Sequence, residues 1–191
     1  QTRRAALKVI HETFHFMGLS VSDERSVPTD TKVLGSQARD TLPTILQFFI
    51  ECPAFCHTQG AFESLLYHAK QSLRTQLARS GLERTVFWAS LSAKTIVYKA
   101  LTTAADLEVF YPDLQESNYK ARFALFHRRF STNTRTSWDK AQPFRMIAHN
   151  GEINTIECNR SWNFAREQSL GLPKDELFTR EDISDSGNLN E

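Results

Sequence analysis

The sequence predicts a protein of the α+β class, with amphipathic helices and separate β-strands. Residues 2–18 and 61–80 carry apolar side chains at steps of three and four, the spacing of one helix face. Shorter runs rich in β-branched and aromatic residues are typical of strands. Two strand-like runs, ending near Arg129 and His149, are each followed by small polar residues. Because a sheet can present such groups to a ligand at its rim, the pattern also indicates a pocket.

Composition limits what that pocket can serve. A chain of 191 residues, 40% of them hydrophobic, fits one domain over 1–191 with a core of ordinary size. Its 23 Lys and Arg against 22 Asp and Glu leave a net charge of +1, so no strong field would attract nucleic acid or an anionic membrane. No apolar run of spanning length follows the first residues. We therefore expect a cytoplasmic protein with neither nucleic-acid nor membrane partners.

Metal binding is the less favoured interpretation of two clusters. Cys52 and Cys56 have metal-like spacing, but no second ligand pair lies at a suitable distance in the sequence. Together with Cys158 they are too few for a disulfide-stapled domain, so buried or idle thiols are expected. His11 and His15 lie four residues apart, yet nothing beside them supplies the glutamate of a zinc-protease motif. We expect no metal at either place.

The N-terminal half is expected to alternate helix and loop. The helix over 2–18 ends at a glycine, a residue suited to a helix C-terminus. Residues 19–43 are rich in Ser, Asp, Thr and Pro and predict a loop. The period of the apolar run 42–50 does not separate helix from buried strand, and a strand is favoured. The helix over 61–80 is the most regular element and also ends at a glycine.

The chain from residue 85 onward is expected to mix strands and helices. Its strand-like segments share β-branched and aromatic side chains and are separated by short polar turns, while its helices end at proline or glycine. The elements expected, in chain order, are a hairpin over 85–91 and 95–99, a short helix over 102–110, strands over 123–129 and 144–149, and a helix from about 154 to 171.

Four residue positions suggest the chemistry of the pocket. Arg129 ends a predicted strand, where a guanidinium can grip a carboxylate through two parallel hydrogen bonds. Asn150-Gly151 offers an amide donor and an unshielded backbone N–H, the usual parts of an oxyanion hole. Asp185 could hold an ammonium group. Each also has an ordinary alternative, respectively a surface ion pair, a hairpin turn and a charge in a solvated tail.

A family resemblance favours the functional interpretation. The runs His127–Thr134 (HRRFSTNT), Ala141–Arg145 (AQPFR) and His149–Thr155 (HNGEINT) resemble the class-II glutamine amidotransferase domain of the glutamate synthase large subunit. Further similar segments, in the same order as in that family, are 27–28, 34–35, 91–92, 95–99, 110–114 and 137–138.

The resemblance implies an N-terminal-nucleophile hydrolase fold, a four-layer αββα sandwich, of which this chain would hold a part. It also implies hydrolysis of L-glutamine to glutamate and ammonia, with the ammonia channelled to 2-oxoglutarate. Arg129 and Thr132 would bind the glutamine α-carboxylate, Asn150 and Gly151 would form the oxyanion hole, and Asp185 would hold the α-ammonium.

The resemblance further implies partners and cofactors outside this chain. FMN and an iron–sulfur cluster would sit in other domains of the large subunit, with none in this chain. The electron donor, ferredoxin or a nicotinamide, is not predicted, because those versions differ outside this region. The compartment would be the cytoplasm, or the plastid stroma in a plant or alga.

The sequence departs from the family at its first residue. The family's nucleophile is a cysteine at the mature N-terminus, whose free α-amine acts as the base. Here residue 1 is Gln1, and all three cysteines are internal. We therefore expect an N-terminally incomplete domain that is inactive as a glutaminase by itself. Smaller departures, Glu24 and Arg135-Thr136, bear on packing and rim contacts.

Two alternatives stay open. One is the amidotransferase domain of a different ammonia-using synthase, which would share the pocket. The other is a non-catalytic domain that binds glutamine for regulation, for which a missing nucleophile would be natural.

Overall fold

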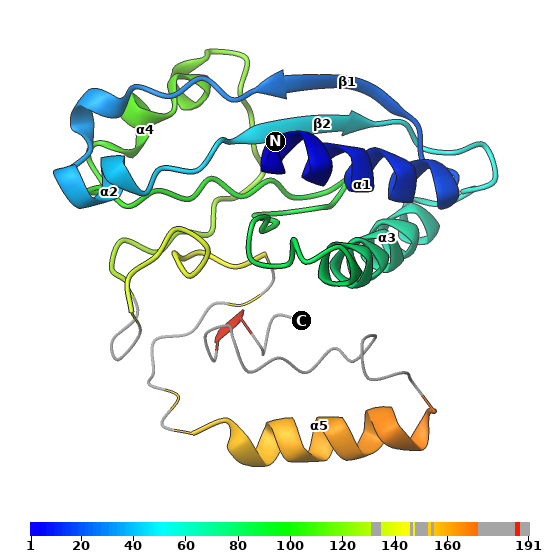
Figure 1. Ribbon diagram of the computed structural model, residues 1–191. Coiled ribbons are helices and arrows are strands. Elements are labelled where there is room, and N and C mark those ends of the chain that lie inside the picture. Colours follow the sequence, from blue (N-terminus) through cyan, green and yellow to red (C-terminus); the bar gives the residue numbers. More distant parts are fainter. Residues whose placement is uncertain (131–134, 146, 148–152, 154, 172–185, 188–191) are drawn as a thin grey trace.

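A computed structural model of the chain is shown in Figure 1, and it describes residues 1–130, 135–145, 147, 153, 155–171 and 186–187. The elements are, in order, α1 (Thr2–Phe16), β1 (Val21–Ser26), the 3₁₀ helix η1 (Thr31–Val33), α2 (Ser36–Asp40), β2 (Leu46–Ile50), α3 (Gln59–Arg79), α4 (Leu107–Phe110), the 3₁₀ helix η2 (Pro112–Gln115) and α5 (Glu157–Ser169). No helix among these residues is both long and apolar enough to cross a lipid bilayer.

The sheet of the described residues is a single antiparallel pair. Val21 of β1 lies opposite Ile50 of β2, and Ser26 lies opposite Leu46, with an irregularity in the register after Val21. Helices α1 and α3 contact each other and pack against this sheet (Figure 1).

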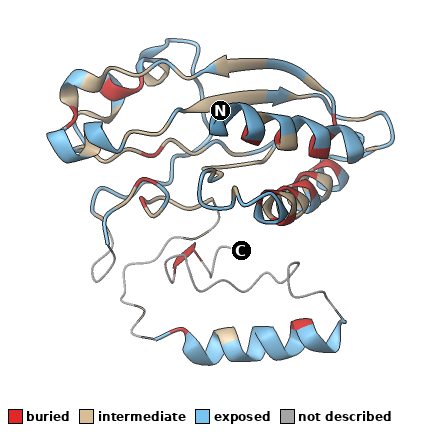
Figure 2. Ribbon diagram, in the orientation of Figure 1, coloured by how far each residue is buried: buried red, intermediate tan, exposed pale blue. Residues whose placement is uncertain are grey.

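The first core lies where the two helices meet the sheet. Its buried side chains come mainly from the inner faces of α1 and α3, which carry the buried positions in Figure 2. They are Ile10, Phe14, Leu19, Phe62, Leu66, Ala69 and Leu73. Half-buried side chains of β2 and of the segment 86–91 complete this core, among them Phe48 and Trp88.

The second core lies at the other end of the sheet. Its buried members are Leu34, Phe110, Tyr111 and Trp138. The rings of Phe110 and Tyr111 meet edge to face with centroids 4.6 Å apart, a favourable geometry for aromatic pairs. Apolar side chains of the segment 98–101 pack on this core, so the chain from 86 to 101 runs from one core to the other.

The three long predicted helices are confirmed as α1, α3 and α5. Each is followed by a glycine in the left-handed region, with φ of +71° at Gly18, +67° at Gly81 and +68° at Gly171. At the first two, the next residue's N–H returns to a carbonyl of the last helical turn, at 2.9 Å from Leu19 and 2.7 Å from Leu82. Glycine adopts this conformation without a Cβ clash, which explains why the helices end there.

The predicted loop over 19–43 is wrong in part, because it contains β1. Ser22, Asp23 and Glu24 are polar residues in the middle of that strand, so the strand lacks the apolar alternation that would reveal it. Backbone pairing with β2 forms it instead. The strand favoured within 42–50 is confirmed as β2, Leu46–Ile50.

The predicted β-hairpin over 85–99 is wrong, because its two runs do not pair as strands. Neither run is a strand in the structure. The chain reverses instead at Ser92, whose Oγ accepts hydrogen bonds from the N–H groups of Lys94 and Thr95 at 3.1 and 3.2 Å. The runs pack their apolar side chains into the two cores, and side-chain burial rather than cross-strand pairing accounts for their β-like composition.

The later predictions fare unevenly. The helix over 102–110 shortens to α4, and the chain continues past Pro112 as η2. Residues 123–129 are irregular and exposed, with 78% of Phe123 and 79% of Phe126 accessible, so that strand is wrong in this structure. The described residues of the strand expected over 144–149 also lie outside any strand.

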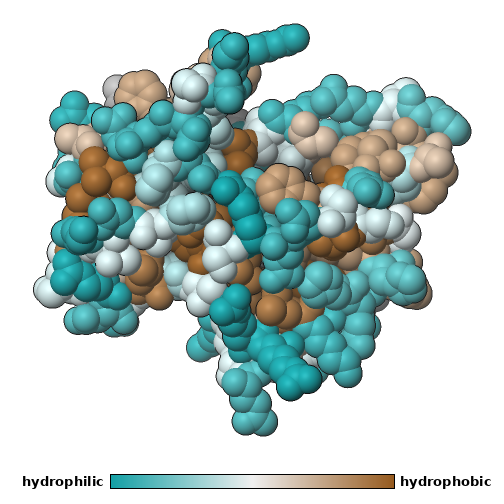
Figure 3. All heavy atoms as spheres, turned by 90° about the horizontal axis from the view of Figure 1, so that it is seen from above, coloured by the Kyte–Doolittle hydropathy of each residue, from teal (hydrophilic) through white to brown (hydrophobic). Residues whose placement is uncertain are grey.

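Helices and an antiparallel sheet fit the α+β class, while the described residues hold one two-stranded sheet rather than two layers of strands. Seen from above, hydrophilic side chains cover much of the molecule, with apolar patches between them (Figure 3).

Candidate active site

Arg129 is the predicted site residue that the structure describes. Its backbone N–H donates to Nδ1 of His127 at 3.2 Å, and its side chain is exposed. Within the described part of the chain, the guanidinium makes no hydrogen bond or ion pair. The other predicted site residues, Thr132, Asn150, Gly151 and Asp185, lie outside the described residues.

Arg129 lines a cavity of about 2410 Å³. Small-molecule sites usually occupy roughly 300–1,000 Å³, so this space exceeds what one amino acid needs. Much of the described lining comes from residues 83–104, 119–130 and 136–145, and residues of 33–43 and of α3 add to it. Those parts contain several of the segments that resemble the amidotransferase family, which places them around one space.

One wall is the segment 138–145, which we name the link. Trp138 at its start is buried, and its indole N–H donates to the Ala38 carbonyl at 3.2 Å. At the next residue, the Asp139 carbonyl accepts a hydrogen bond from Lys99 Nζ at 3.2 Å. The same Nζ lies 4.6 Å from the ring centroid of Phe144. A cation over an aromatic face is attracted by the ring quadrupole, so Lys99 holds the link at two points.

Lys99 is unusual for a charged residue because it is buried, with only 6% of its surface exposed. Burial lowers the pKa of its ammonium group to about 8, and the charge of Lys70 acts in the same direction. Asp139 opposes the shift by favouring the charged form.

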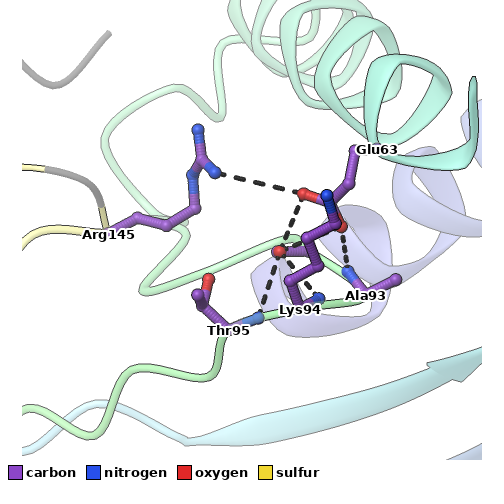
Figure 4. A network of polar contacts seen from close by, with 6 residues as sticks. Glu63, Ala93, Lys94, Thr95 and Arg145 are labelled. Atoms are coloured by element: carbon purple, nitrogen blue, oxygen red, sulfur yellow. Dashed lines mark hydrogen bonds and ion pairs between the residues drawn. The ribbon is translucent and has the colours of Figure 1, made fainter. Parts of the chain in front are cut away.

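Glu63 of α3 organises a polar cluster at the same wall (Figure 4). The Ser92 hydroxyl lies 3.0 and 2.9 Å from its two carboxylate oxygens, and the backbone N–H of Ala93 also donates to it. Arg145, at the end of the link, points toward Glu63, with Nη1 4.0 Å from Oε2. Glu63 thus joins α3, the turn at Ser92 and the link.

A second polar network joins the sheet to η2. The Arg25 guanidinium of β1 binds the Asp113 carboxylate through both terminal nitrogens, and its Nε donates to Gln47 of β2 at 2.7 Å. The Tyr98 hydroxyl donates to Asp113 Oδ2 at 3.2 Å. Burial, with the charge of Asp113, raises the pKa of Tyr98, so its hydroxyl stays protonated and donates. This network is structural, since a charge pair with its hydrogen-bonding capacity occupied has little left for a ligand.

The histidines and cysteines considered above as metal ligands are not grouped around a common point in the described residues. His11 Nε2 lies 3.0 Å from Glu24 Oε2, so the family departure at Glu24 does create a local packing contact. Cys52, Cys56 and Cys158 are free thiols, two of them exposed. Among the described residues, no three His, Cys, Asp or Glu side chains are grouped so as to hold a metal ion.

Lys99, Glu63 and Asp113 escaped prediction as functional or supporting residues. Two of them lie inside segments that resemble the family, Tyr98-Lys99 and Pro112-Asp113. The sequence did offer one signal for Lys99, because a charged residue there directly follows an apolar, β-branched run. Glu63 carried none, since a glutamate on a helix is ordinarily solvated.

Comparison with known proteins defines the class. The family of class-II glutamine amidotransferases matches residues 1–190. The chain therefore belongs to the class-II glutamine amidotransferases, as its motifs predicted.

Its relatives narrow the class further. The chain is 40% identical over 171 residues to "Ferredoxin-dependent glutamate synthase 2, chloroplastic" of Arabidopsis thaliana, a match that covers 90% of this chain and 10% of the relative. It is 40% identical over 178 residues to "Glutamate synthase [NADH]" of Saccharomyces cerevisiae, at 89% and 8%. It is 38% identical over 168 residues to "Glutamate synthase [NADPH] large chain" of Bacillus subtilis, at 88% and 11%. The chain thus spans about a tenth of the length of these curated relatives.

Proposed function

We propose that this chain is the glutamine-binding part of a glutamate synthase large subunit, which hydrolyses L-glutamine and passes the ammonia to 2-oxoglutarate in another domain. The observation that carries the proposal is the family match over residues 1–190, together with relatives that are named glutamate synthases. The cavity supports it, because Arg129 and several family-like segments line the same space.

The proposed roles follow from the chemistry of an amide substrate. Arg129, with Thr132, binds the α-carboxylate of glutamine, and Asp185 balances its α-ammonium. Asn150 and Gly151 donate hydrogen bonds to the oxygen that becomes negative when a thiolate attacks the side-chain amide. Ammonia leaves, and water then cleaves the thioester to give glutamate. The complete site is proposed to lie in the four-layer sandwich of the N-terminal-nucleophile hydrolases.

The attacking thiol is proposed to come from sequence outside these 191 residues. Such a thiol needs a free α-amine beside it as base, whereas Cys52, Cys56 and Cys158 are internal. FMN, an iron–sulfur cluster and an electron donor would serve the other domains. We therefore expect these 191 residues to bind glutamine without hydrolysing it.

Titration calorimetry with L-glutamine tests the proposed role of Arg129. Lysine cannot reproduce the two parallel hydrogen bonds of a guanidinium, so Arg129→Lys should weaken binding by at least roughly tenfold. Arg4→Lys is the matched control, because Arg4 is an exposed arginine of α1 that does not line the cavity, and it should bind as the wild type does. Equal affinities of the two variants would remove Arg129 from the site.

An ammonia-release assay tests the rest of the proposal. The chain by itself should release no ammonia from glutamine, and the same domain preceded by a cysteine-initiated segment should do so. Turnover by the 191-residue chain that survives replacement of all three cysteines would contradict the proposed chemistry.

A further inference from the structure

The link is held at three points, each from a different part of the chain. Trp138 anchors its start through the Ala38 carbonyl, and Glu63 faces Arg145 at its end. Lys99 anchors the stretch between them, through the Asp139 carbonyl and the Phe144 ring. Lys99 differs from the other two anchors because it is a nearly buried cation.

A buried cation at this place needs a physical reason. Removing an ammonium group from water is costly, and an apolar side chain of similar length would avoid that cost. An apolar side chain, however, would leave the Asp139 carbonyl without this donor and the Phe144 face without its cation. Lys99 also lines the same cavity as Arg129, so the charge lies at a wall of the candidate site rather than in the interior of a core.

We propose that Lys99 is a positioning residue for glutamine binding, which holds the link as a fixed wall of the cavity that Arg129 lines. This inference rests on the proposed function. Lys99 would not touch glutamine itself. Its ammonium group would keep Asp139 and Phe144 in place, so that the cavity is organised before the ligand arrives and less ordering is required on binding.

The inference carries a pH dependence. The charged groups that face Lys99 are Asp139 of the link and Lys70 of α3. Because burial and Lys70 together lower the pKa of Lys99 to about 8, the ammonium loses its proton just above neutral pH. The neutral amine still donates a hydrogen bond to the Asp139 carbonyl. Because a loosened link would expose Lys99 and bring its pKa back toward that of a free lysine, loss of the proton favours the closed link, which should become better ordered as the pH rises through 8.

Hydrogen exchange on the 191-residue chain tests the anchor without reference to glutamine. In Lys99→Met, amides of 139–145 should exchange at least roughly tenfold faster at pH 7, while those of α1 and α3 keep their wild-type rates. Lys99→Arg, which retains a charge and donors, should restore part of the protection. The matched control is Lys8→Met, since Lys8 is an exposed lysine of α1 whose partner is Glu12 at 3.7 Å.

Two exchange results would overturn the inference. One is wild-type protection of the link in Lys99→Met. The other is an equal increase over α1, α3 and the link, because that would show general destabilisation. If Lys99→Met does not fold, Lys99→Gln, an uncharged donor, takes its place, and the inference then requires less protection of the link than in Lys99→Arg.

Glutamine affinity tests the positioning role. Lys99→Met should bind glutamine roughly tenfold more weakly, and Lys99→Arg should recover most of the affinity. The ratio of wild-type to Lys99→Arg affinity should rise between pH 7 and 9, because the closed link favours the neutral amine, arginine keeps its charge, and glutamine's own titration cancels in the ratio. A loosened link with unchanged affinity, or a constant ratio, would overturn the role. If the wild type binds no glutamine, the proposed function fails, and the exchange experiment still decides the anchor.

Discussion

At the scale of single residues, Lys99 shows most directly how tertiary structure changes chemistry. In the sequence it is one lysine among 23 basic residues, whereas in the fold it is 6% exposed and its pKa is lowered to about 8. The unfolded chain would keep the ordinary lysine pKa of about 10.4. Between these two values the unfolded state binds more protons than the folded state, so stability rises with pH across that window.

This linkage gives a quantitative prediction. From pH 8 to 9.5, the free energy of unfolding of the wild type should rise by about 1.5 kcal/mol relative to that of Lys99→Met. Each pH unit contributes at most about 1.4 kcal/mol, and Lys99 is already half deprotonated in the fold at pH 8. Urea titrations of both proteins at the two pH values measure the difference. Comparing the two proteins cancels the titration of the tyrosines. A difference that does not change with pH would show that Lys99 keeps its ordinary pKa in the fold.

Arg129 illustrates the opposite case at the same scale. Its assignment as a carboxylate clamp came from residue type, from its place at the end of an apolar run and from the family resemblance. Its exposed side chain at the cavity fits that assignment, although residues 123–129 do not form the strand expected to carry it. The role therefore stays a prediction, and it does not depend on the backbone being regular.

At the scale of elements, α3 is where sequence and structure agree best. Its apolar residues recur at helical spacing, Thr58 caps its start by accepting from the Ala61 N–H at 3.1 Å, and Gly81 ends it. All these signals lie within about 25 residues and need no partner to be recognised. Strands β1 and β2 differ, because their pairing joins segments that no local pattern relates.

The inner face of α3 carries a prediction of its own. Leu73 is fully buried in the first core, so Leu73→Ala should lower the free energy of unfolding by about 2–5 kcal/mol through lost burial and a residual cavity. Leu170→Ala is the control, because Leu170 is 63% exposed at the end of α5 and should change stability by less than about 0.5 kcal/mol. Urea titrations give both values. A small effect at Leu73 would mean that the first core is not packed as described.

At the scale of the whole molecule, the first and second cores are connected in two ways, by a chain segment that packs in both and by an ion pair. The segment 86–101 packs in both cores, and the Arg25–Asp113 pair ties the sheet to η2. Such connections favour one cooperative unit over two that open separately.

Native-state hydrogen exchange in increasing urea tests that cooperation. The opening free energies of amides in α3 and in residues 107–114 should converge on one value before global unfolding. Helix α5 is the internal comparison. Because nearly all its residues are exposed (Figure 2), its amides should open at lower cost. Two separate isotherms for the first and second cores would show that they unfold independently.

The sequence by itself determined the class of protein, the three long helices with their glycine ends, and the residues proposed to bind glutamine. Those features depend on local spacing, on turn chemistry and on motifs that are long enough to be specific. Tertiary structure alone decided that the polar stretch 21–26 is a strand, that the β-rich runs of 85–99 pack without forming a ladder, and that Lys99 is buried beside the link. Each of those outcomes depends on which distant segment supplies the partner, because burial and strand pairing are properties of contacts rather than of residues.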